Sequence, residues 1–187
     1  MAILRKPLQA LLCGALGLTL FVRGAGGAEA PTEYQVKAVF VYNFSRFVEW
    51  PPQTFTSPDE PFVIGVLGSD PFGARLDEAV HGEQIDQHPL VVRHFRNLAE
   101  IGDCRILYID RSEGAKLPQV LAALDHRSTL TVADLDGSSE HGVMIQFTTE
   151  NKRIRLRINV ESARAAGLTI SSKLLRTADI VGPRSGT

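Results

Sequence analysis

Apolar and polar residues alternate most regularly in residues 153–160. Arginine occupies positions 153, 155 and 157, and isoleucine or leucine occupies the positions between them. A period of two is typical of a strand with one buried face and one exposed face. The segment therefore predicts a half-buried strand. Its arginine row is usual for a solvated strand face, although an acidic patch on a partner protein can also contact such a row.

Two short helices are predicted after this strand. Residues 161–166 form a helical turn, and Gly167 closes it because glycine tolerates the left-handed conformation at helix ends. Ser171 or Ser172 caps a last helix. Four residues here are not required by the core pattern and are candidates for binding a partner protein: Glu161, Arg164, Ile170 and Lys173. The alternative is that these four residues have no binding role and are ordinary surface together with an edge of the core.

A period of three to four residues predicts a long helix near the start of the folded region. Thr32 or Glu33 supplies its first turn, and the apolar stripe runs to about Glu49. Pro51 is expected to stop the helix, because proline has no N–H to donate.

Between these ends, strands alternate with helices. A continuous apolar run at residues 62–67 is typical of a strand that is covered on both faces. Further strands are predicted at residues 90–95, 105–110, 130–133 and 143–148. Further helices are predicted from the segment 68–73, which opens the first of them, to about residue 80, and from residue 116 to 125. A turn at residues 150–151 pairs the last two strands as a hairpin. The pattern predicts a single α/β domain with a mostly parallel central sheet flanked by helices and an antiparallel hairpin near the C-terminus.

The loop at residues 68–73 is a candidate ligand site. It leaves the end of a buried strand and leads into a helix, which is where α/β folds bind ligands. Its glycines match neither phosphate-loop spacing, and Asp70 before Pro71 is also explained as a helix cap. The candidate small-molecule contacts are Trp50, Gly68, Ser69, Asp70 and Phe72.

Residues 1–30 are typical of a cleaved secretory signal peptide. Two basic residues precede an apolar stretch, and small residues follow it. The alternative, a membrane anchor, is disfavoured because the apolar stretch is shorter than the roughly 20 residues that a span needs. The folded domain is therefore expected to comprise residues 31–187.

Charge and cysteine content narrow the function further. Without residues 1–30 the chain has 17 Lys and Arg and 20 Asp and Glu, a net charge of −3. Nucleic-acid binding is disfavoured, because it usually needs a strongly basic domain. Cys104 is then the only cysteine, so no intrachain disulfide can form. Cys104 is expected to be a buried small hydrophobe; the alternative is a thiol that links two subunits.

The sequence lacks the known catalytic and metal-binding patterns. None of the five histidines has a second ligand at a zinc-binding spacing, and no Gly-x-Ser-x-Gly elbow is present. Asp134 and Asp136 are two residues apart but are better explained as turn formers. The expectation is a protein that is not an enzyme and needs no metal or cofactor.

Several blocks of sequence, in order, resemble the YfiR family of periplasmic proteins. They span residues 33–51, 63–73, 104–109, 130–134 and 155–181. The resemblance implies an exported α/β protein of the Gram-negative periplasm with a tendency to form a homodimer. It also implies a regulatory role, in which the protein binds the periplasmic sensor domain of an inner-membrane diguanylate cyclase (YfiN-like) and represses it. Repression lowers cyclic di-GMP and biofilm formation.

The single cysteine and a second possible function limit what the resemblance implies. Relatives with paired cysteines can couple folding to redox state, whereas Cys104 alone has no internal partner. The alternative function is a periplasmic small-molecule-binding sensor subunit that acts on a membrane sensor kinase.

Overall fold

The computed structural model describes residues 31–57 and 59–182 of the 187-residue chain. The predicted signal peptide, residues 1–30, lies outside the described residues. In the described part of the chain, no helix has both the length and the apolar character needed to cross a bilayer.

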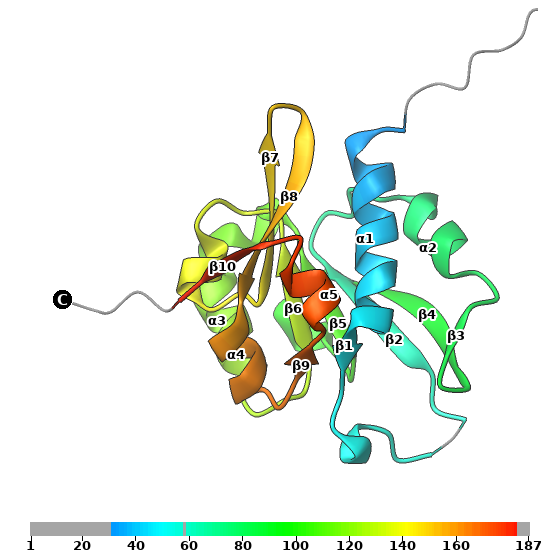
Figure 1. Ribbon diagram of the computed structural model, residues 1–187. Helices are drawn as coiled ribbons and strands as arrows, with labels where there is room; N and C mark the ends of the chain where they lie inside the picture. The colour runs from blue at the N-terminus through cyan, green and yellow to red at the C-terminus, as the bar shows by residue number, and fades with distance from the viewer. Residues whose placement is uncertain (1–30, 58, 183–187) are drawn as a thin grey trace, which may run out of the picture. The chain divides into compact units, whose positions relative to one another are not determined.

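An eight-stranded sheet runs through the domain (Figure 1). Its strand order is β10-β8-β7-β6-β5-β2-β4-β3. The strands are β2 (Phe62–Leu67), β3 (Gln84–Ile85), β4 (His88–Phe95), β5 (Ile106–Ile109), β6 (Leu130–Ala133), β7 (Ile145–Glu150), β8 (Arg153–Asn159) and β10 (Asp179–Val181). Five adjacent strands, in the order β4-β2-β5-β6-β7, are parallel to one another. Strand β8 pairs antiparallel with β7. The predicted α/β domain with a mostly parallel sheet and a late hairpin is confirmed.

The order of the five parallel strands sets where a ligand is expected in this architecture. Taken in chain order they lie as second, first, third, fourth and fifth, the doubly wound arrangement of flavodoxin-like folds. The chain leaves β2 toward β4 on one side, and the later strands continue from β5 on the other side, so the strand order reverses between β2 and β5. Ligands of such folds bind outside the carboxyl ends of the strands at that point.

Helices cover both faces of the sheet. They are α1 (Glu33–Phe47), α2 (Ala74–Val80), α3 (Leu117–Ala123), α4 (Val160–Ala165) and α5 (Ser172–Leu175). A separate two-stranded sheet pairs β1 (Val48–Glu49) with β9 (Thr169–Ile170). It joins the end of α1 to the segment between α4 and α5, two parts of the chain about 120 residues apart.

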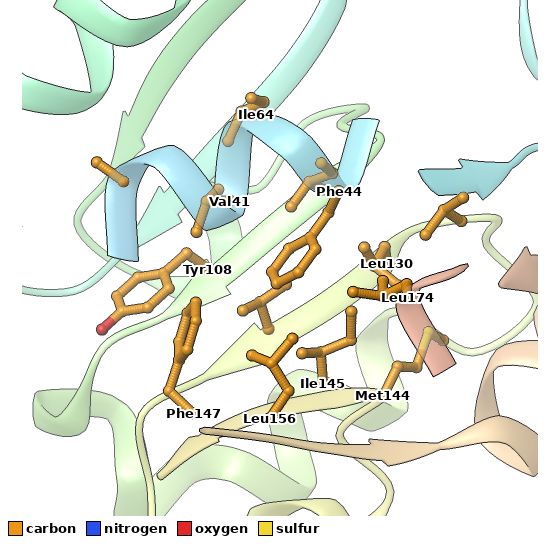
Figure 2. Close-up of a cluster of buried hydrophobic side chains, with 14 of the residues drawn as sticks. Val41, Phe44, Ile64, Tyr108, Leu130, Met144, Ile145, Phe147, Leu156 and Leu174 are labelled. Atoms are coloured by element: carbon orange, nitrogen blue, oxygen red, sulfur yellow. The ribbon is translucent and has the colours of Figure 1, made fainter. Parts of the chain in front are cut away.

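The core consists of two layers of apolar side chains, one on each face of the sheet. Because successive strand residues point to opposite faces, Ile64 belongs to one layer and Val63 to the other. Figure 2 shows Val41 and Phe44 of α1 directed toward the strands in the first layer. The second layer packs under α3 and contains Cys104, which is 2% exposed. Burial of the Cys104 thiol is therefore confirmed.

The first helix begins where the sequence predicted and ends earlier. Thr32 is its N-cap, and its side chain accepts the N–H of Gln35, whose own side chain accepts the N–H of Thr32. The helix ends at Phe47, because Val48 and Glu49 extend to pair with β9. That pairing lies outside the reach of a local helical pattern.

Two turns also differ from the prediction. The hairpin turns at Asn151 and Lys152, both with positive φ, one residue later than expected; such a two-residue turn matches the twist of the strands. Asp70 does not cap α2, because Gly73 precedes that helix. Instead the carboxylate of Asp70 accepts the N–H of Phe72 at 2.8 Å, which is a local Asx turn.

Candidate functional site

Three of the four candidate partner-binding residues lie on the surface of α4 and α5. Glu161 and Arg164 are exposed on α4, three residues apart and so on one side of the helix, and Lys173 is exposed on α5. Ile170 is different: it is 7% exposed, belongs to the core and pairs with Val48. The surface that remains a candidate is therefore formed by Glu161, Arg164 and Lys173, called here the α4–α5 surface.

Hydrogen bonds at both helix starts hold this surface in place. The side chain of the buried Asn159 accepts the N–H of Ser162 at 2.9 Å and donates to the Ser139 carbonyl at 2.8 Å. Ser171 accepts the N–H of Lys173, and its own N–H donates to the Phe47 carbonyl at 2.8 Å. Both short helices are thus tied to the rest of the domain, which suits a surface that must keep one shape.

The candidate ligand loop is packed closely against its neighbours. The N–H of Gly68 donates to the Phe95 carbonyl at 2.9 Å, and the N–H of Ser69 donates to the hydroxyl of Ser112 at 3.0 Å. Phe72 is fully buried, and its ring meets that of Tyr108 edge to face at 4.6 Å. These two N–H groups are already satisfied within the fold, so the loop does not offer them to an anion.

Trp50 is not brought to this loop. Its ring lies 5.0 Å from that of Phe62, which is the first residue of β2, whereas Gly68 follows the last residue of the same strand. The five candidate ligand residues therefore fall into two places, with Trp50 at one end of β2 and Gly68 to Phe72 at the other. Ligand binding by either group stays a prediction.

A buried ion-pair network, which the sequence did not reveal, lies near the carboxyl ends of the parallel strands. Lys37 of α1 is completely buried, and its Nζ donates to Asp134 at 2.7 Å and to Glu33. Asp134 follows β6 directly, and it also accepts from Arg111 at 3.1 Å and from the Tyr34 hydroxyl at 3.3 Å. Two cations and two carboxylates give a network that is neutral overall.

The network perturbs the pKa values of both carboxylates. Burial alone would raise the pKa of Asp134, but hydrogen bonds from Lys37 and Arg111 outweigh it and lower that pKa below its ordinary value. The hydrogen bond from Lys37 likewise lowers the pKa of Glu33. Both groups are therefore held as carboxylates, and Lys37 fixes α1 at the end of the sheet where this architecture places ligands.

The sequence contained a weak signal for this network. Asp134 stands directly after an apolar strand, which marks the carboxyl edge of the sheet. Lys37 sits between apolar residues of the first helix, and only the packing of α1 on the sheet shows that its ammonium is buried. A periodicity argument assigns such a lysine to the exposed side.

A pocket of about 710 Å³ lies beside Phe62, at the opposite end of β2 from the candidate loop. The end of α1, the segment from β1 to residue 55 and the β3–β4 hairpin form its walls. Trp50, Phe55, Phe62 and His88 contribute the aromatic lining. Sequence patterns do not predict this pocket, because the strand β3 has only two residues and shows no period.

No group of three or more His, Cys, Asp or Glu side chains within residues 31–57 and 59–182 is arranged to hold a metal ion. Three features of the described structure are candidates for function: the fixed charged surface on α4 and α5, the ion-pair network under α1 and the aromatic pocket beside Trp50.

Solved structures of other proteins share the fold. An ABC domain in complex with L-Trp from Streptococcus pneumoniae matches with a TM-score of 0.52 and 13% identity over 79% of this chain. A conserved domain protein from Vibrio cholerae matches with a TM-score of 0.54 and 13% identity over 80% of this chain. This chain covers 60% of each of them, and at such identity the likeness concerns the fold alone.

No curated protein sequence shows significant similarity to the chain. A protein-family model described as YfiR/HmsC-like does match, over residues 34–179, which is most of the chain. That match agrees with the resemblance already seen in the sequence blocks. It spans the elements from α1 to the start of β10, including the α4–α5 surface. The chain belongs to the YfiR/HmsC-like family, which is a family of periplasmic regulators.

Proposed function

We propose that this protein binds the periplasmic sensor domain of an inner-membrane diguanylate cyclase of the YfiN type and represses it. Repression lowers cyclic di-GMP and biofilm formation. Family membership over residues 34–179 is the observation that carries the proposal. The protein acts by contact, as a homodimer in the periplasm, and performs no chemical conversion.

The α4–α5 surface is the proposed contact. Glu161, Arg164 and Lys173 are exposed, and none of them makes an ion pair with another residue in the described part of the chain. Charges that are free on a fixed backbone are available for a complementary partner, where they steer association and fix the orientation of the complex.

Charge reversal tests this contact. The variant Glu161→Arg/Arg164→Glu should lose co-purification with the cyclase's periplasmic domain, and cells that carry it should have cyclic di-GMP as high as a strain lacking the protein. The melting temperature should not change, because exposed substitutions rarely alter stability. Glu78→Arg, which reverses one exposed charge on α2, is the control and should still bind. Binding that survives the double reversal would remove the α4–α5 surface from the proposal.

The gene neighbourhood tests the partner class separately. A co-transcribed membrane protein with a cyclase domain supports the proposal, whereas a histidine kinase supports the second candidate. That candidate is a periplasmic small-molecule-binding sensor subunit acting on a membrane sensor kinase, and the 710 Å³ pocket is the observation that favours it. It predicts that a bound metabolite raises the melting temperature.

A further inference from the structure

The pocket beside Trp50 has the size of a small-molecule site. Its volume of about 710 Å³ falls within the range of roughly 300–1,000 Å³ that ligand pockets occupy. Its lining combines aromatic rings with charged side chains, among them Arg46, Glu49 and Asp86.

Aromatic rings form the apolar part of the pocket. The rings of Trp50 and Phe62 meet edge to face with centroids 5.0 Å apart, and Phe55 stacks on His88 at 3.8 Å. Phe62 is completely buried and His88 nearly so, so these two rings are held by the core. Aromatic ring faces carry partial negative charge and attract cations. The Phe55 faces are already taken by His88 and by the Arg105 guanidinium, 4.6 Å from the ring centroid, so Trp50 is the ring that a ligand cation would meet.

The charged groups at the pocket are not balanced. Arg46 is paired with Glu83 at 2.8 Å and with the Tyr42 hydroxyl, so its charge is already compensated. Glu49 and Asp86 line the same pocket, are exposed, and make no ion pair with other residues in the parts of the chain described here. The uncompensated charge at the pocket is therefore negative, and phosphate or carboxylate ligands are disfavoured.

Asp86 is held at this place by a tight hairpin turn. Asp86 and Gln87 form the two-residue turn between β3 and β4, with φ of 49° and 74°. The left-handed region costs a residue other than glycine about 1–2 kcal/mol, and aspartate tolerates it better than most. Positive φ at both central residues is the usual geometry of a two-residue hairpin turn, as at Asn151 and Lys152, so the turn fixes the backbone position from which the Asp86 carboxylate projects.

His88 adds a hydrogen-bond acceptor. Its Nδ1 lies 2.6 Å from the Glu60 carbonyl, and because a carbonyl only accepts, Nδ1 carries a proton. In the neutral ring, Nε2 is then an acceptor. Together with the carboxylates of Glu49 and Asp86, the polar groups of the pocket suit a ligand that donates hydrogen bonds and carries positive charge.

We propose that this pocket binds a small organic cation, namely an amine or ammonium compound with a flat apolar body. The apolar body lies against the ring of Trp50 and the edge of the Phe55 ring, and the cationic group faces Glu49 and Asp86. Aromatic rings together with carboxylates are the usual way in which proteins recognise such cations. The inference does not depend on which membrane protein is the partner.

Trp50 makes the pocket directly observable, because it is the only tryptophan in the chain. Its fluorescence can be followed while the purified protein is titrated with phenethylammonium chloride, with the neutral 2-phenylethanol and with the anionic 3-phenylpropionate. The three probes share one ring and differ in charge. We expect a saturable change with phenethylammonium, at least tenfold weaker binding of the alcohol, and no binding of the carboxylate.

The double variant Glu49→Gln/Asp86→Asn tests the charged groups. Asparagine is chosen at position 86 because it also tolerates the left-handed conformation. The variant should keep its melting temperature and bind phenethylammonium at least tenfold more weakly. Glu78→Gln removes one exposed carboxylate from α2, away from the pocket lining, and should bind like the unmodified protein.

Several results would overturn the proposal. One is equal binding of the three probes, and another is a double variant that binds phenethylammonium as tightly as the unmodified protein. A third is a titration with phenethylammonium that does not saturate at concentrations up to about 1 mM. Capture of an arginine- or lysine-containing peptide without binding of phenethylammonium would also overturn it, since the pocket would then hold a side chain of a protein partner.

Discussion

At the scale of single residues, Lys37 controls how the first helix sits on the sheet. Its ammonium is completely buried and is compensated by Asp134 and Glu33. Lys37→Met should lower the free energy of unfolding by about 3 kcal/mol, because it leaves the buried Asp134 carboxylate with Arg111 as its only charged partner. Urea unfolding measures the loss. Lys173→Met, at an exposed position, is the control and should change stability by less than about 0.5 kcal/mol.

The same network gives stability a defined pH dependence. Folding lowers the pKa of Asp134 from its ordinary 3.8 and that of Glu33 from 4.5. A depressed pKa stabilises the folded state above the ordinary value, and this contribution is lost as the pH falls through the folded pKa. The stability difference between the unmodified protein and Asp134→Asn should therefore stay constant down to about pH 5 and shrink below about pH 4. A difference that grows on acidification would contradict this assignment.

Cys104 is expected to be chemically silent in the folded protein. Burial raises the pKa of its thiol to about 12, so almost no thiolate forms at neutral pH. In a Cys13→Ser background, an alkylating reagent at pH 8 should leave Cys104 unmodified, and full modification should follow addition of guanidinium chloride. Rapid labelling of the native protein would contradict the buried position and reopen the alternative of a thiol that links two subunits.

At the scale of elements, the loop after β2 depends on Gly68. Its φ is +92°, and a Cβ at this position would lie 2.5 Å from the Ser112 hydroxyl oxygen. Gly68→Ala should therefore lower the unfolding free energy by about 1–3 kcal/mol, through strain and through displacement of Ser112. Gly102→Ala, where nothing lies within 4 Å of the added carbon and φ is not positive, is the matched control. Equal urea midpoints for the two variants would show that the loop adapts freely.

Elements with a long regular pattern were predictable from the sequence, and elements made by distant pairing were not. The ends of β8 could be predicted from its alternating residues, which reflect one buried and one exposed face. The ends of β2 could be predicted from its continuous apolar run, which reflects burial on both faces. Strands β1, β3 and β9 have two residues each, too few for any period to show. They exist because a partner elsewhere in the chain, or across a tight turn, supplies their hydrogen bonds.

Candidate site residues follow the same division. The exposure of Glu161, Arg164 and Lys173 could be predicted, because charged residues on short helices rarely enter a core. The burial of Ile170 could not, since it depends on pairing with Val48 far away in the sequence. The pocket beside Trp50 is likewise formed by α1, β1 and the β3–β4 hairpin together.

At the scale of the whole domain, the two-stranded sheet β1–β9 lies between the pocket and the α4–α5 surface. Val48 and Glu49 line the pocket, and they pair with Ile170 and Thr169. The chain enters β9 from α4 and leaves it into α5, the two helices that carry the α4–α5 surface. A ligand that shifts β1 therefore acts on a strand whose ends continue toward that surface.

This arrangement predicts coupling between the two sites. Saturating phenethylammonium should change the dissociation constant of the membrane partner by about fivefold or more, and the partner should change the affinity for phenethylammonium by the same factor, because coupling between two binding sites is reciprocal. Isothermal titration in both orders measures the two factors. The Glu49→Gln/Asp86→Asn variant is the control, since it should bind the partner normally and show no response to the cation. A coupling factor of one, with both ligands bound, would mean that β1–β9 holds the fold together and transmits nothing.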